Sequence, residues 1–95
     1  MANTNALAKT GEELFKIINE ANEAADLYRV AKAKKTLEII APKDPPPGFK
    51  KPTEMATLAI LDADDELTKL RRERDTKAAI MYVAKAEFIA PDSEQ

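Results

Sequence analysis

The sequence predicts an all-α fold, in which two long helices joined by a Pro-rich loop form an antiparallel helical hairpin. Two long stretches rich in Ala, Glu and Lys flank a loop that holds most of the prolines. The helices would be about 45 Å and 57 Å long, against about 30 Å for a compact domain of this size. Such a thin hairpin cannot bury its own apolar surface, so we expect oligomerisation to complete it as a helical bundle.

The first helix is expected from about residue 11 to residue 41. Thr10-Gly-Glu-Glu13 has the form of a capping box. In this motif the Thr10 hydroxyl accepts from the Glu13 amide, and the Glu13 carboxylate returns to the Thr10 amide. Pro42 ends the helix because proline lacks an amide donor and restricts the residue before it.

The apolar residues of this helix form two groups, about a third of a turn apart. The first group is Leu14, Ile17, Ile18, Ala21, Ala25 and Tyr28, and the second is Val30, Ala33, Leu37 and Ile40. A coiled-coil drift of about 20° per heptad is too small for this step. Either the helix bends near Tyr28, or its two halves pack against different neighbours. The second possibility implies a partner.

The second helix is expected from about residue 53 to residue 90, because Pro91 follows. A coiled-coil seam with 4-3 spacing is formed by Ala56, Ile60, Ala63, Leu67 and Leu70, and we expect it to continue through Arg74, Ala78, Met81, Lys85 and Phe88. Further apolar residues surround both ends of the helix. One antiparallel neighbour cannot cover a helix that is apolar on several sides.

The loop of residues 42–52 contains the run Pro45-Pro46-Pro47, which favours stiff polyproline II geometry. One interpretation is a rigid spacer that reverses the chain, with Phe49 packed against the end of the hairpin. The other is a docking strip for an aromatic-lined groove, with Phe49 as an exposed anchor. The sequence leaves both open.

Composition indicates a single domain, residues 1–95, with no disulfide framework because cysteine is absent. The 15 basic and 17 acidic side chains give a net charge of −2, which argues against nucleic-acid binding and against anionic membranes. No signal peptide is recognisable, and the longest apolar run, residues 78–84, is far short of the ~20 residues that span a bilayer. We therefore expect a soluble protein of the cytoplasm.

The sequence lacks the residue types on which most enzymes depend for catalysis. There is no His or Cys, and the only Ser is Ser93, so the usual general base and nucleophiles are missing. The one dense acidic cluster is Asp62, Asp64, Asp65 and Glu66, which we interpret as a solvated turn. Asp62 and Glu66 could hold a divalent cation weakly. We expect no enzyme activity, no cofactor and no metal site.

The leading hypothesis is therefore a non-enzymatic interaction or assembly module that self-associates or docks on a larger protein partner. The predicted core is Leu14, Ile18, Ala21, Tyr28, Ile60, Leu67, Leu70 and Met81. The predicted partner or oligomer interface is Leu37, Ile40, Phe49, Ala56, Ile60, Leu67, Leu70, Arg74, Met81, Phe88 and Ile89.

Two alternatives belong to other classes. One is a module that binds a small anionic ligand at a subunit interface through Arg71, Arg74 and Tyr28. The other, less favoured, is a DNA-associated regulator, whose binding would weaken steeply with salt.

No family motif is recognisable. At the level of fold alone, the chain is similar to two-helix hairpins found among small secreted virulence partners, phage accessory proteins and virion parts. The secreted class usually carries a Trp-x-Gly turn, and this chain has no Trp. One version of the leading hypothesis is an assembly or virion component, and another is a small inhibitor that occupies a groove of a host protein. A phage-encoded chain would be found in the host cytoplasm or the virion. Fold does not fix function.

Overall fold

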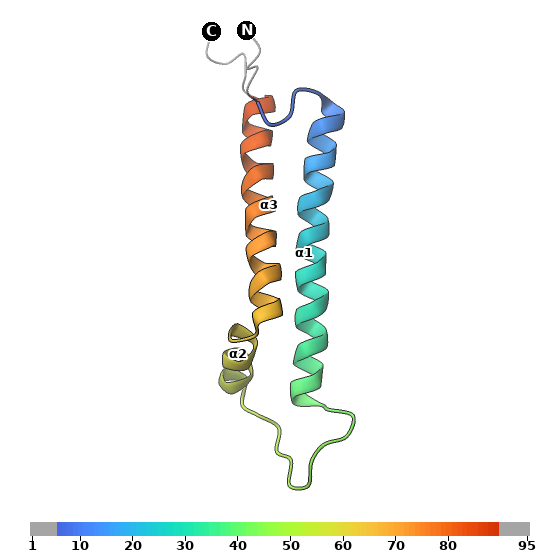
Figure 1. Cartoon of the computed structure of the whole chain (residues 1–95), viewed down its shortest axis with the longest axis vertical. Helices are drawn as coiled ribbons and strands as arrows, with labels where there is room; N and C mark the ends of the chain where they lie inside the picture. The colour runs from blue at the N-terminus through green and yellow to red at the C-terminus, as the bar shows by residue number, and fades with distance from the viewer. Residues whose placement is uncertain (1–5, 90–95) are drawn as a thin grey trace.

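A computed structural model of the chain describes residues 6–89 and contains three helices and no strand in that part. They are α1 (Gly11–Ile40), α2 (Glu54–Asp62) and α3 (Asp65–Ile89). The predicted all-α class is confirmed. Helices α1 and α3 lie side by side and antiparallel, and α2 lies near the loop that joins it to α1 (Figure 1). The molecule measures 69 × 21 × 17 Å. Its radius of gyration of 19.7 Å, against about 12 Å for a compact domain of this length, makes it an elongated hairpin.

Local hydrogen bonds fix both ends of α1. The Thr10 hydroxyl accepts from the Glu13 amide at 3.1 Å, as the capping motif predicts. The Glu13 carboxylate accepts the amide of Lys9 at 3.2 Å, one residue before the Thr10 amide that the motif predicts. At the other end the Ala41 amide donates to the Leu37 carbonyl at 2.8 Å, directly before Pro42. The helix is continuous through Tyr28.

The second predicted helix is two helices, so the prediction of one helix over residues 53–90 is wrong. Helix α2 ends at Asp62, and α3 begins at Asp65. The Asp64 carboxylate accepts the Leu67 amide at 2.9 Å, and the Asp64 carbonyl accepts the Thr68 amide at 2.9 Å. Asp64 therefore caps the start of α3, a position that suits aspartate much better than a helix interior. Residue 90 lies outside the described residues.

The break also resets which residues face inward. On α2 the buried residues are Thr57 and Leu61, whereas the predicted seam residues Ala56 and Ile60 are exposed. Ile60 retains 50% of its exposure, so its place in the predicted core is wrong. The turn between α2 and α3 interrupts the helical register. The predicted seam assumed one continuous register, and this is why it placed Ile60 in the core.

Along α3 the inward face is close to the prediction but slips near its end. Leu67 and Ala84 are buried, and the half-buried positions between them are Thr68, Leu70, Arg71, Arg74, Lys77 and Met81. The predicted seam positions Ala78 and Lys85 are exposed. A strict alternation of three and four residues from Leu67 reaches positions 77 and 84, one residue earlier than predicted.

The core of the hairpin is made of small side chains. Its buried apolar residues are Ala8, Ala21, Ala24, Leu61, Leu67 and Ala84. Of the predicted core, Ala21 and Leu67 are buried, and the half-buried members are Leu14, Ile18, Tyr28, Leu70 and Met81. At the open end of the hairpin the Leu7 amide donates to the Glu87 carboxylate at 3.1 Å, which connects the segment before α1 to α3.

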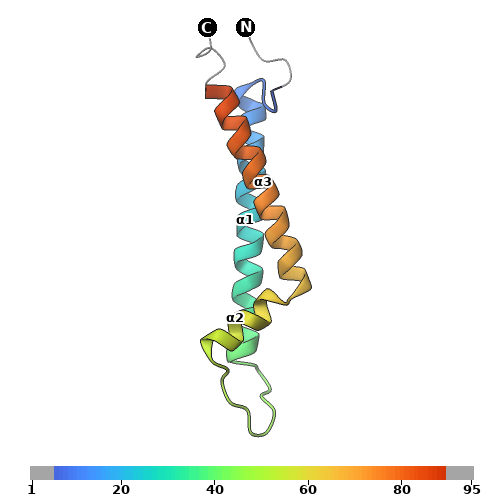
Figure 2. The same cartoon turned by 90° about the vertical axis from the view of Figure 1, so that its left-hand side faces the viewer.

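Of the second apolar group of α1, only Ile40 meets a different neighbour, α2, whereas Val30, Ala33 and Leu37 are exposed. Most of α1 packs on α3, while its last turns, including Thr36 and Ile40, adjoin α2 (Figure 2). The second neighbour is thus part of the same chain. The split in the apolar face does not by itself require a partner.

The connection between α1 and α2 reverses the chain at a tight turn. The Phe49 amide donates to the Pro46 carbonyl at 3.0 Å, and Gly48 between them has φ 78°. Proline followed by a residue of positive φ is the pattern of a type II turn, and glycine adopts that φ without strain. The Phe49 side chain is exposed.

Candidate interaction surface

Much of the apolar surface of the hairpin faces solvent. Among the described residues, the only large apolar side chains that are buried are those of Leu61 and Leu67. The exposed ones are Leu7, Phe15, Leu27, Val30, Leu37, Phe49, Met55, Leu58, Ile60, Ile80, Tyr82, Val83, Phe88 and Ile89. Exposed apolar side chains in this number make a binding role the first hypothesis for the surface.

The structure divides the predicted interface residues into three groups. Those with exposed side chains are Leu37, Phe49, Ala56, Ile60, Phe88 and Ile89. Those that are half-buried between helices are Ile40, Leu70, Arg74 and Met81. Leu67 is only 3% exposed, so it belongs to the internal packing of the hairpin. The exposed large apolar residues of α2 and α3 that the predicted interface did not include are Met55, Leu58, Ile80, Tyr82 and Val83.

Two grooves adjoin on one side of the hairpin. The first, which we call the Tyr28 groove, has a volume of about 730 Å³ and is lined by Ala25, Tyr28, Arg29, Lys32, Ala33, Thr36, Leu37 and Arg74. The second, the α2 groove, has a volume of about 470 Å³ and is lined by Lys32, Thr36, Ile40, Lys51, Pro52, Glu54, Thr57, Leu58 and Leu61. Because Lys32 and Thr36 line both, the two grooves form one channel along α1. Helix α2 forms a wall of only one half.

The Tyr28 groove is basic. The Arg74 guanidinium lies 4.5 Å from the centre of the Tyr28 ring, and the Lys32 ammonium lies 5.9 Å from it. Arg74 also pairs with Asp75 at 2.9 Å, and Arg29 pairs with Asp26 at 3.5 Å. Lys32 forms no ion pair with any residue that the structure describes. No carboxylate lines this groove.

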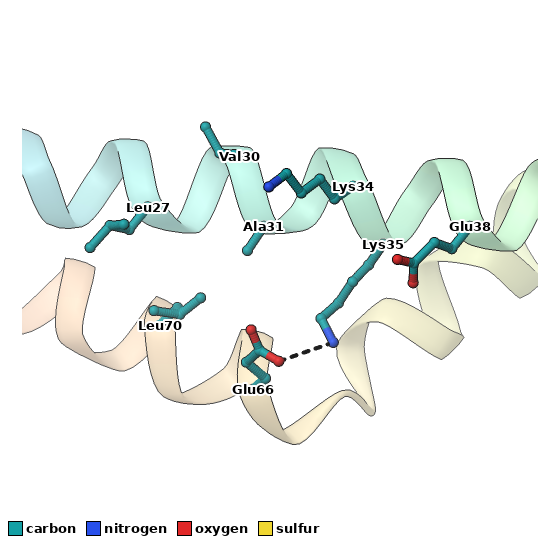
Figure 3. A pocket seen from close by; sticks show the side chains of 8 residues that line it. All are labelled: Leu27, Val30, Ala31, Lys34, Lys35, Glu38, Glu66 and Leu70. Atoms are coloured by element: carbon teal, nitrogen blue, oxygen red, sulfur yellow. Dashed lines mark ion pairs between the residues drawn. The ribbon is translucent and has the colours of Figure 1, made fainter.

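The opposite side of the hairpin has a different character. Its pocket is lined by Leu27, Val30, Ala31, Lys34, Lys35, Glu38, Glu66 and Leu70. Figure 3 shows Leu27 and Ala31 directed toward Leu70 of α3, whereas Val30 points away from α3. Charges of both signs line this side, and Lys35 pairs with Glu66 at 3.4 Å. The two basic and two acidic residues leave this side without an excess of either sign.

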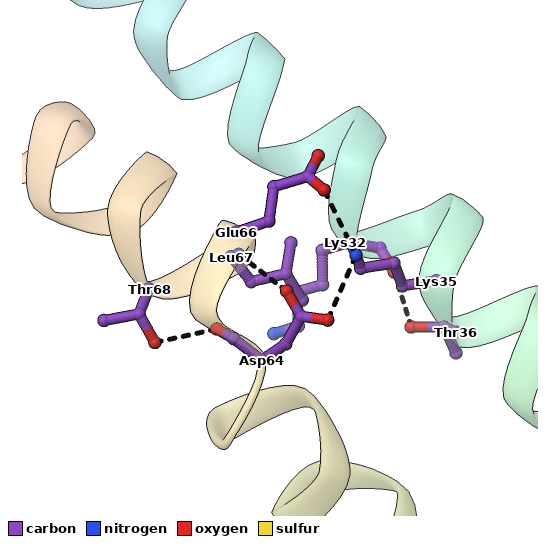
Figure 4. Close-up of polar contacts among 7 residues, drawn as sticks. All are labelled: Lys32, Lys35, Thr36, Asp64, Glu66, Leu67 and Thr68. Atoms are coloured by element: carbon purple, nitrogen blue, oxygen red, sulfur yellow. Dashed lines mark hydrogen bonds and ion pairs between the residues drawn. The ribbon is translucent and has the colours of Figure 1, made fainter.

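The acidic cluster predicted as a solvated turn has a structural role. The Lys35 ammonium donates to the Asp64 carboxylate at 3.0 Å and lies between Asp64 and Glu66 (Figure 4). The hydrogen bond from the Leu67 amide, followed by that from Lys35, holds the pKa of Asp64 below its ordinary value. The bond to Asp64 in turn raises the pKa of Lys35. The cluster thus fastens the start of α3 to α1.

The weak cation site considered for Asp62 and Glu66 is not favoured by this geometry, because Glu66 is directed to Lys35. Within residues 6–89, no group of three or more His, Cys, Asp or Glu side chains is placed to hold a metal ion.

The proposed ligand-binding alternative is brought together only in part. Tyr28 and Arg74 share a groove, but Arg71 does not line it. Sequence reasoning missed a second cross-helix ion pair, between Lys77 and Glu20 at 3.4 Å. The one-residue slip of the predicted seam concealed it, because the prediction faced Ala78 inward instead of Lys77.

Within the described residues, every helix is too short or too polar to cross a lipid bilayer. Comparison with protein-family models found no match, and comparisons with curated proteins and with solved structures also found none.

Proposed function

We propose that this chain is a non-enzymatic protein–protein interaction or assembly module, which self-associates or docks on a larger partner through its apolar helix faces. The observation that carries the proposal is the exposure of most of its large apolar side chains. Burial of such side chains on association is the main favourable contribution to most protein–protein binding.

The surface area of the chain supports the same proposal. The accessible surface is 7452 Å², whereas a compact monomer of 10.5 kDa exposes about 5,400 Å². The difference of about 2,000 Å² exceeds the roughly 800 Å² that each partner buries in a standard interface. One hairpin therefore has enough surplus surface for a stable contact.

The alternative of a small anionic ligand is less well supported. Its central cation, Arg74, already pairs with Asp75 and stacks on Tyr28. A ligand would have to displace or share the Asp75 contact.

The test combines solution mass with cross-linking. Light scattering after size-exclusion chromatography, over a wide concentration range, should show a defined oligomer if the chain self-associates. A photoreactive phenylalanine analogue at Tyr82, Leu37 or Met55, in cells of the source, should yield an adduct with a second protein if it docks elsewhere. The same analogue at Glu12, an exposed polar position, is the control. A strict monomer that yields no adduct from any of the three apolar positions would refute the proposal.

A further inference from the structure

We propose that the occupant of the Tyr28 groove is helix α2 of a second copy of this chain, in a reciprocal two-fold dimer. This inference rests on the proposed function and adds the partner, the element and the site. Its starting point is the channel along α1, in which α2 of the same chain walls the half near Ile40, whereas the half near Ala25 is lined outside α1 only by Arg74 of α3.

The placement of the two grooves suits a two-fold axis. They meet at Lys32 and Thr36. A two-fold axis that lies across the open side of the channel above that point, perpendicular to α1, places each half of the channel opposite the other half of a second copy. A second copy related by this axis would carry its own α2 to the half near Ala25. The contact is isologous, since each chain gives one helix and receives one, and it closes at two copies.

The free face of α2 carries exposed apolar side chains that suit the apolar floor of the Tyr28 groove. Met55, Ala59 and Asp62 share one face of the helix, turned away from the side on which Thr57, Leu58 and Leu61 line the α2 groove. Met55 is 82% exposed, so this face has no cover in the single chain. The Tyr28 groove offers it Ala25, Ala33 and Leu37, together with the ring of Tyr28.

The charges are complementary as well. Helix α2 has no basic residue, and Asp62 on its free face forms no ion pair within the described part of the chain, whereas Glu54 lines the α2 groove of its own chain. The Tyr28 groove carries three cations, of which Lys32 is the one without an ion pair. A two-fold dimer brings these remaining charges of opposite sign together twice. The opposite side of the hairpin offers no such excess, because two basic and two acidic residues line it and Lys35 pairs with Glu66.

The decisive experiment exchanges charges between the two elements. Lys32→Glu should weaken the dimer about tenfold, since every dimer contains the contact twice and each contact changes from attraction to repulsion. Asp62→Lys should do the same, and a lysine in the last turn of α2 suits the helix dipole. An equimolar mixture of the two variants should restore a heterodimer to within about threefold of the original affinity, because every contact then again joins opposite charges.

Lys34→Glu is the matched control. It makes the same change of charge on the same helix, two residues away and on the opposite side of the hairpin. Its dimer affinity should change less than about threefold. Circular dichroism should show the helix content of every variant unchanged, which separates loss of contact from loss of fold.

A second readout locates the contact. The chain has no cysteine, so introduced ones are unique. A mixture of Ala33→Cys and Met55→Cys chains should be joined by a short bis-maleimide, whereas a mixture of Lys34→Cys and Met55→Cys should not.

Three results would overturn the inference. If the chain dimerises but Lys32→Glu behaves like Lys34→Glu, self-association stands and this site is wrong. If the variants weaken the dimer but their mixture does not restore it, Lys32 and Asp62 do not meet across the interface. A monomer at every concentration would exclude the second copy as occupant, and the proposed function would then depend on the cross-linking to a foreign protein.

Discussion

Replacing Ala84 by leucine tests the packing of the hairpin at its most enclosed point. Ala84 is 0% exposed, and the other buried residues on this half of the hairpin, Ala8, Ala21 and Ala24, are also alanines. Small residues at a helix contact allow the axes to approach to about 8 Å. A leucine at 84 must therefore separate the helices or adopt a strained rotamer.

The expected cost follows from the closeness of this contact. Overpacking a well-filled site costs about 1–3 kcal/mol, and the open end of the hairpin has some freedom to separate. That end is nevertheless fastened by the hydrogen bond from the Leu7 amide to Glu87, at 3.1 Å. We therefore expect a loss of about 2 kcal/mol in the free energy of unfolding. With a slope of about 1–3 kcal/mol per molar urea, the unfolding midpoint should fall by about 1 M.

The assay is urea unfolding followed by circular dichroism, at two protein concentrations so that any effect on association is seen separately. The control is Ala78→Leu, the same change at an exposed position of the same helix. It should alter the free energy of unfolding by no more than about 0.5 kcal/mol. If Ala78→Leu is the more damaging of the two, the inward face passes through position 78, and the register described above is wrong.

Three further predictions concern the hydrogen bonds and ring contact that hold the helices. Asp64→Asn should reduce the acid dependence of stability: the folded pKa of Asp64 is below its ordinary value of 3.8, so its contribution is complete above that pH and is lost as pH falls through the folded pKa. The pKa of Lys35 is raised, so the stability that Lys35 contributes is complete below pH 10.5 and is lost as pH rises through its folded pKa. Thermal unfolding as a function of pH measures the contributions of Asp64 and Lys35. An Asp64→Asn variant that loses stability in acid as steeply as the original chain would contradict the role given to Asp64. Thr53→Ala should lower the free energy of unfolding by about 1 kcal/mol, measured by urea unfolding, because the Thr53 hydroxyl accepts the Ala56 amide at 3.1 Å. Thr53→Ser keeps the hydroxyl and should retain stability. Equal losses in the two variants would show that the Thr53 hydroxyl does not cap α2. A double-mutant cycle of Tyr28→Leu and Arg74→Met should give a coupling of about 0.5–1 kcal/mol for the contact at 4.5 Å, and additive effects would show that the pair does not interact.

The existence of long helices and of the hairpin could be predicted because their signals are local. The Thr10 cap and the stop at Pro42 both act within a few residues, and the structure places the ends of α1 within one residue of the prediction. The elongated shape followed from helix length alone. None of these steps needs knowledge of which residues meet across the hairpin.

The break before α3 was missed because the apolar spacing passes through it without a gap. Ala56, Ile60, Ala63 and Leu67 keep 4-3 spacing, so periodicity favours one helix. The available signal was chemical: Asp64 followed by Asp65 and Glu66 resembles the capped, acidic first turn of a new helix. The partner of that turn, Lys35, is 29 residues away, and sequence spacing cannot reveal such a contact.

The candidate surface was predictable as a surplus of apolar residues, but its location was not. The continuous second helix of the prediction places Ile60 in the core and leaves Met55 and Leu58 without a defined position. In the structure the turn at Ala63–Asp64 swings α2 away from the axis of α3, so Leu61 is buried and Ile60 is exposed. The break therefore creates the one short helix whose two faces differ: one covers α1, and the other has no cover.

The size of α2 gives this arrangement a thermodynamic consequence. A helix of 9 residues is too short to be stable alone in water, so α2 depends on its caps and on the contacts of Thr57 and Leu61. An element held by so few contacts lies at the low-stability end of a fold. If a second copy covers the free face of α2, association stabilises α2. The conformational entropy lost when α2 becomes ordered then lowers the affinity of the dimer. The strength of the dimer and the helicity of residues 54–62 must then rise together with concentration, whereas docking through the far end of α3 would leave α2 unaffected.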